Sequence, residues 1–160
     1  MTPVEAATAL FKTMPAPVSV DQLAEYGIDA SESNARHIAR EILSLNLYWI
    51  LAAVDAHIPL KYRAAIRETL FETIKTRWWQ PGQLGEGAWS EYQQEVTERR
   101  VVYGRLVDEE GMSHMAVSAE AASLIEDQGY VATEDRQKLL VLLIDYAPAA
   151  QYGTLLDNVG

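Results

Sequence analysis

Cysteine is absent from this chain of 160 residues, and phenylalanine occurs only twice. Without cysteine there is no disulfide bond, no thiol nucleophile, and no thiolate ligand for zinc or an iron–sulfur cluster. Six prolines and nine glycines are too few for a collagen-like or low-complexity chain. With 49% hydrophobic and 22% charged residues, the composition is that of a globular protein.

Positive charge is also in short supply. Thirteen Lys and Arg residues stand against twenty-three Asp and Glu residues, which gives a net charge of −10 at pH 7. A chain of this sign repels the phosphates of nucleic acids and of anionic lipids. We therefore expect neither nucleic acid nor a membrane among its partners.

Uninterrupted apolar runs are short. The longest uncharged and mainly apolar run, Ile42 to Val54, has 13 residues, whereas a membrane-spanning helix needs about 20. Residues 1–10 contain no basic residue ahead of an apolar stretch, so they do not have the pattern of a secretory signal. The sequence therefore predicts a cytoplasmic protein.

What the sequence does contain is helical periodicity. Apolar residues recur at intervals of three and four along most of the chain, which is typical of α-helices packed on one face. The predicted helices span residues 4–14, 19–26, 32–57, 60–79, 89–110, 113–128, 134–147 and 148–156. We predict an all-α fold in one domain, 1–160, as a bundle of four to five main helices with short N-terminal helices packed across it.

The segment 32–57 has apolar stripes on two sides and is the predicted central, most buried helix. Asp29 and Glu32 are spaced like an N-terminal capping box for it, and Ser19 is the predicted cap of the preceding short helix. In the helix 89–110, Glu95 and Arg99 are four residues apart and predict an ion pair on its exposed side.

The charge is unevenly spread along the chain. Residues 61–107 contain eight bases and six acids, whereas residues 108–160 contain ten acids and two bases. This asymmetry has two interpretations: basic and acidic helices pack together, or an acidic face docks a basic partner.

Trp78 and Trp79 lie side by side at a predicted helix end, where two successive side chains point about 100° apart. One interpretation places Trp78 in the core and Trp79 over a loop. The other leaves a tryptophan exposed, as in many binding hot spots. We predict an interaction surface of Trp78, Trp79, Arg63 and Arg67.

Polar residues interrupt otherwise apolar helices at Asn46, Asp55 and Asp145, and His57 lies two residues after Asp55. A carboxylate on a buried helix needs a partner, which it finds either within the fold or in a ligand. With eight tyrosines and four tryptophans in the chain, these four residues are the candidate site for a small apolar or aromatic ligand between helices.

Motifs for chemistry are lacking. None of the three histidines lies three residues after a glutamate, as the Glu-x-x-His motif of di-iron bundles requires. The glycine-rich stretch 82–87 has neither a preceding strand nor a following Lys-Ser/Thr pair, so it is not a P-loop. We assign no catalytic residue, metal ligand or cofactor, and the sequence favours a non-enzymatic role.

The function that the sequence favours is protein–protein interaction or self-assembly, a dimer being one form, in a bacterial-type cytosol. The alternative is a binding module for a small apolar or aromatic ligand.

Overall fold

The computed structural model describes residues 1–109, 111 and 113–157. Helices connected by turns and short loops make up this part of the chain, which contains no β-strand, and the predicted all-α fold is confirmed. The α-helices are α1 (Pro3–Thr13), α2 (Val20–Glu25), α3 (Glu32–His57), α4 (Leu60–Ile74), α5 (Trp89–Gly104), α6 (His114–Asp127), α7 (Arg136–Asp145) and α8 (Ala149–Leu156). Single π-helical turns, η1 (Lys75–Trp79) and η2 (Arg105–Glu109), extend α4 and α5, and a 3₁₀ turn, η3 (Thr133–Asp135), precedes α7.

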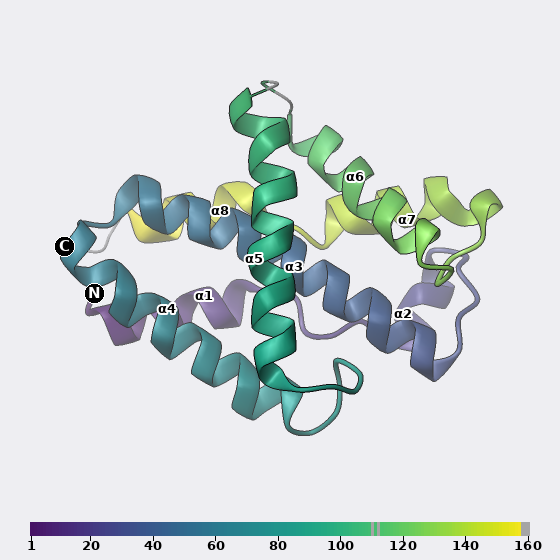
Figure 1. Ribbon diagram of the computed structural model, residues 1–160, viewed down its shortest axis with the longest axis horizontal. Coiled ribbons are helices and arrows are strands. Elements are labelled where there is room, and N and C mark those ends of the chain that lie inside the picture. The colour runs from purple at the N-terminus through teal and green to yellow at the C-terminus, as the bar shows by residue number, and fades with distance from the viewer. Residues whose placement is uncertain (110, 112, 158–160) are drawn as a thin grey trace.

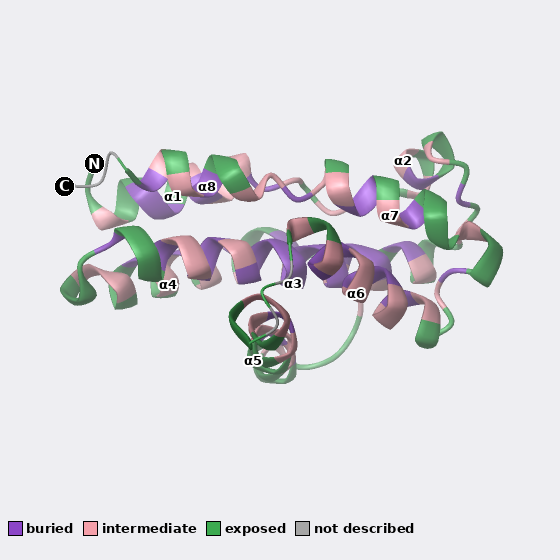
Figure 2. Ribbon diagram, turned by 90° about the horizontal axis from the view of Figure 1, so that it is seen from above, coloured by how far each residue is buried: buried purple, intermediate pink, exposed green. Residues whose placement is uncertain are grey.

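The helices form two layers and a crossing helix (Figures 1 and 2). One layer contains α1, α8, α7 and α2, and the other contains α4, α3 and α6. The layers meet where α1 packs on α4, α8 on α3, and α7 on α6. On the far side of the second layer, α5 crosses α3 and is seen end-on in Figure 2.

The central helix is α3, as the sequence predicts. Most of its residues from Ala35 to Val54 are buried, because other helices cover it on several sides. It ends at His57, and its C-cap Ile58 is extended because the ring of Pro59 disfavours a helical conformation in the residue ahead of it.

The predicted N-terminal caps are only partly right. The Ser19 hydroxyl accepts a hydrogen bond from the Gln22 backbone, and the Gln22 side chain completes a capping box. The cap of α3 is Ser31, whose hydroxyl accepts from the Asn34 backbone. The prediction of an Asp29 cap is therefore wrong, because a serine next to the first helical residue supplies the oxygen at the required position.

The connection between η1 and α5 turns the chain sharply. Gly82, Gly85 and Gly87 have φ values of 84°, 93° and 116°, a region that residues with a Cβ rarely adopt. This loop leads the chain out of the second layer, and α5 then crosses α3. Short connections would instead favour an antiparallel arrangement of neighbouring helices.

The C-terminal run Thr133–Leu156 is long and apolar enough, by length and composition, to cross a membrane. In the structure it comprises η3, α7 and α8, with Pro148 between the two helices. One third of the most apolar 18-residue window in this run is buried. The core contains Leu139, Leu142 and Leu143. Core packing therefore explains part of this apolar character, and the absence of a membrane partner stays a prediction.

Candidate functional site

The interface between α3 and α5 is polar at its centre. Glu95 accepts two hydrogen bonds from the Arg40 guanidinium, at 2.7 and 3.2 Å. Arg99 donates two to Glu41, at 2.7 and 3.1 Å, and Glu41 is only 3% exposed. Bidentate ion pairs of this kind are strong and directional. We call these four residues the α3–α5 seam, and they hold α5 across α3.

The seam corrects the prediction of an exposed Glu95–Arg99 pair. Glu95 and Arg99 each form an ion pair with a residue of α3 instead. Their four-residue spacing therefore provides two ion pairs to the neighbouring helix. The hydrogen bonds that Arg99 donates to Glu41 raise the pKa of Arg99 above its ordinary value, which keeps its guanidinium charged. The sequence contained one signal for this polar contact, which is the pair of adjacent charged residues Arg40 and Glu41 within a largely apolar helix.

Aromatic rings surround the seam near the start of α5. The Arg40 guanidinium carbon lies 5.0 Å from the ring centre of Trp79 and 5.2 Å from that of Tyr92, within range of a cation–π contact. Trp79 also packs against Trp89, with 5.5 Å between ring centres. Tyr92 is fully buried, and its hydroxyl lies 3.2 Å from that of Ser44. Trp79 is thus held half-buried in an aromatic cluster.

Beside the seam, α3 and α5 border a groove with a volume of about 640 Å³. Three of its nine lining residues are alanine or glycine, and the Asp55–Arg100 ion pair, 3.0 Å long, is part of it. We call this feature the α3–α5 groove, and its lining residues are Tyr48, Ala52, Asp55, Ala56, Thr97, Arg100, Val101, Gly104 and Asp108.

Tyr48 is the one aromatic residue in the lining of the α3–α5 groove. Its side chain is covered except for 7% of its surface, and its hydroxyl makes no hydrogen bond with any residue that the structure describes. Burial raises the pKa of Tyr48, and the nearby Asp108 carboxylate raises it further. The phenol is therefore neutral, with a hydroxyl that can both donate and accept a hydrogen bond.

Asn46 does not lie in the groove. Its amide nitrogen donates to the backbone carbonyls of Ile42 and Tyr146, at 2.9 and 2.8 Å, and its amide oxygen accepts from the Tyr152 hydroxyl at 2.7 Å. The residue is 1% exposed. Its polar groups thus tie α8 and the preceding turn to α3.

The four predicted ligand residues lie in separate places. Asp55 lines the α3–α5 groove, whereas His57 contacts Asp157 at 2.7 Å, at the far end of α8. Asp145 accepts a hydrogen bond from the Tyr26 hydroxyl at 2.5 Å, beside a hollow of about 380 Å³. The structure therefore brings only Asp55 of the four into the groove.

The predicted interaction surface is also divided. Trp78 is 8% exposed and packs against Phe11, with 4.5 Å between ring centres, so it belongs to the core. Arg63 donates to the backbone carbonyls of Asp55 and Ile58 and thereby caps the C-terminus of α3. Trp79, Arg63 and Arg67 are each partly exposed, and their role in binding a partner stays a prediction.

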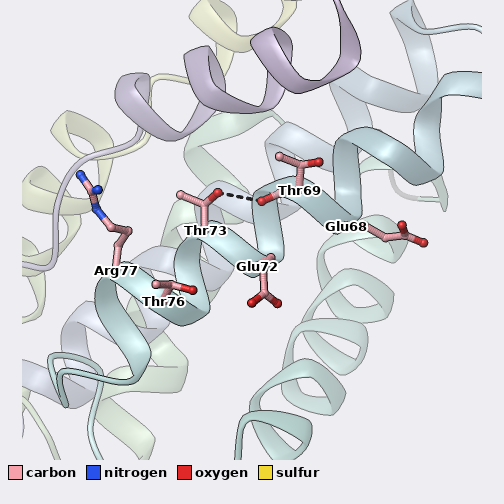
Figure 3. A pocket seen from close by; sticks show the side chains of 6 residues that line it. All are labelled: Glu68, Thr69, Glu72, Thr73, Thr76 and Arg77. Atoms are coloured by element: carbon pink, nitrogen blue, oxygen red, sulfur yellow. Dashed lines mark hydrogen bonds between the residues drawn. The ribbon is translucent and has the colours of Figure 1, made fainter.

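A further hollow of about 510 Å³ lies along α4 and η1 (Figure 3). Its six lining residues all come from this one helical run, so it is a surface depression and not a cleft between elements. The Thr73 hydroxyl bonds to the backbone of Thr69, and Arg77 points away from Glu68. No cluster of converging polar groups forms there among the described residues.

Within the described part of the chain, no three His, Asp or Glu side chains are grouped so that they could hold a metal ion. Searches of protein-family models, curated proteins and solved structures found no match to this chain. The candidate site is therefore defined by geometry alone, and it is the α3–α5 groove, where two helices, an ion pair and a tyrosine with no hydrogen-bond partner among the described residues meet.

Proposed function

We propose that this protein is a non-enzymatic interaction protein that binds a helix of another protein in the α3–α5 groove. The observation that carries the proposal is the groove's lining of small residues on both walls. Ala52 and Ala56 are one turn apart on α3, and Gly104 lies opposite on α5. Small residues let a second helix backbone approach closely, which increases its dispersion contacts.

An exposed apolar residue adds to this surface. Val101 lines the groove and is 55% exposed, on a helix whose outward residues are otherwise mostly polar. A partner helix lying in the groove would cover it, and burial of apolar area is the main driving force of association. The volume of about 640 Å³ suits a few side chains of such a helix.

Site-specific photo-crosslinking tests the proposal with a matched pair of positions. Val101 and Val141 are both valines on helix surfaces, 55% and 53% exposed, but only Val101 lines the groove. Each is replaced in turn with benzoylphenylalanine and irradiated in cells of the source organism. We expect one discrete adduct from position 101 and none from position 141.

The mass of the adduct identifies the type of partner. A mass other than twice 17.8 kDa indicates a different protein, as proposed, whereas an adduct of twice 17.8 kDa indicates a second copy of the chain and would replace the proposed partner with self-association. Equal crosslinking at both positions, or none at position 101, would contradict the proposal.

A small-molecule ligand is the second candidate, and Tyr48 favours it. Its hydroxyl is free to bind within a groove whose volume lies in the usual range for ligand sites. Native mass spectrometry of the purified protein distinguishes the candidates, since a retained small molecule adds a constant mass to the monomer.

A further inference from the structure

In the α3–α5 groove, the carboxylate of Asp108 and the ring of Tyr48 both lie close to Gly104. A Cβ atom placed on Gly104 would lie 3.8 Å from Asp108 Oδ2 and 4.0 Å from Tyr48 Cε1. Since Gly104 has no side chain, the Asp108 carboxylate and the Tyr48 ring both lie within van der Waals distance of one point in the groove that no side chain of Gly104 fills. A negative charge and an aromatic ring therefore both lie within 4.0 Å of this point.

The charges of the groove are not balanced. Arg100 and Asp55 neutralise each other through their 3.0 Å contact. Asp108 makes no ion pair or hydrogen bond to any residue in the described part of the chain, and it is exposed. No cation in the described part of the chain therefore compensates the Asp108 carboxylate, and the net charge of the chain is −10.

We infer that the partner helix is basic and that it places the cation of a lysine or arginine side chain between Asp108 and Tyr48. This inference rests on the proposed function. A carboxylate accepts charge-assisted hydrogen bonds from such a cation, the phenol oxygen accepts another, and a tyrosine ring attracts positive charge. An acidic partner side chain would meet the Asp108 carboxylate and be repelled.

The test uses a pair of helical peptides that differ at one position. Both are capped, alanine-rich 15-residue helices, one with a central lysine and the other with norleucine, which has a similar length and no charge. Amide chemical shifts of the ¹⁵N-labelled protein report where and how tightly each peptide binds. We expect the lysine peptide to shift the amides of groove residues and to bind about tenfold more tightly.

Two variants and a control locate the cation. Asp108→Asn should abolish the tenfold preference for lysine, and Tyr48→Phe should reduce it, because it removes the phenol oxygen but keeps the ring. Asp145→Asn removes an exposed carboxylate outside the groove and should leave the preference unchanged. Circular dichroism confirms that each variant is folded.

The outcomes separate this inference from the proposed function. Equal binding of both peptides at the groove would overturn the basic partner but not the docking of a helix. Binding of free butylamine as tight as that of the lysine peptide would show a small-amine site and would overturn the helix as occupant. Absence of any shift up to 1 mM peptide overturns the inference, while photo-crosslinking at Val101 decides the proposed function separately.

Discussion

Replacing Arg99 with methionine is the most direct test of how α5 is attached. The substitution removes both hydrogen bonds that Glu41 receives from the guanidinium, at 2.7 and 3.1 Å. Gln128 Nε2, at 3.4 Å, is then its remaining donor among the described side chains. A carboxylate that is only 3% exposed is costly to leave without its ion-pair partner.

The expected loss of stability follows from that burial. Breaking a buried ion pair by removing one partner costs about 3–5 kcal/mol. The Arg99 side chain is 14% exposed, so water can enter where it is removed, and we expect the lower end, about 3 kcal/mol. Because folded domains are stable by only about 5–15 kcal/mol, this loss is readily measured.

The double variant Glu41→Met, Arg99→Met supplies the control. Replacing both charges with apolar side chains is often neutral or stabilising, so we expect a free energy of unfolding within about 1 kcal/mol of the parent protein's. Urea unfolding followed by circular dichroism measures both variants, with unchanged slopes indicating comparable unfolded states. A single-variant loss below about 1 kcal/mol, or a double variant as unstable as the single one, would refute the reasoning.

Two further predictions concern tyrosines. The hydrogen bond to Asp145 raises the pKa of Tyr26 to about 12, and partial burial contributes. Asp145→Asn should lower that pKa toward 10, as measured by NMR titration of ¹³C-labelled tyrosine. Because the folded-state pKa is the higher one, the stabilisation is complete below pH 10 and is lost as the pH rises through 12. Tyr152→Phe leaves the buried Asn46 oxygen without its 2.7 Å donor and should cost about 1–3 kcal/mol in urea unfolding, whereas the control Tyr62→Phe should cost less than about 0.5 kcal/mol.

The helices themselves could be predicted because their signals are local. The apolar stripes of residues 32–57 and the stop at Pro59 depend only on neighbours in the sequence, and α3 spans those residues. The misplaced cap had a local cause too. Asp29 and Ser31 are both acceptable capping residues, and the choice depends on which oxygen is adjacent to the first turn.

The position of α5 could not be predicted, because its attachment depends on a distant segment. Glu95 and Arg99 have ideal spacing for a pair within one helix, yet each bonds to a residue more than 50 positions earlier in the chain. Periodicity reports which face of a helix is apolar, and the packing face of α5 includes charged groups. Tyr48 and Asp108 were missed as site residues for the same reason, since only the crossing of two helices brings them together.

The polar character of the seam has a consequence for the groove. Each bidentate ion pair fixes two N–H···O directions, so α5 cannot rotate about its own axis without breaking these hydrogen bonds. An apolar contact is non-directional and would tolerate several rotations, each turning a different side of α5 toward the groove. The seam therefore keeps Val101 and Gly104 in the groove lining before any partner arrives. A surface that is already in its binding conformation loses less entropy on association, which is how ion pairs that add little net stability would contribute to the proposed binding.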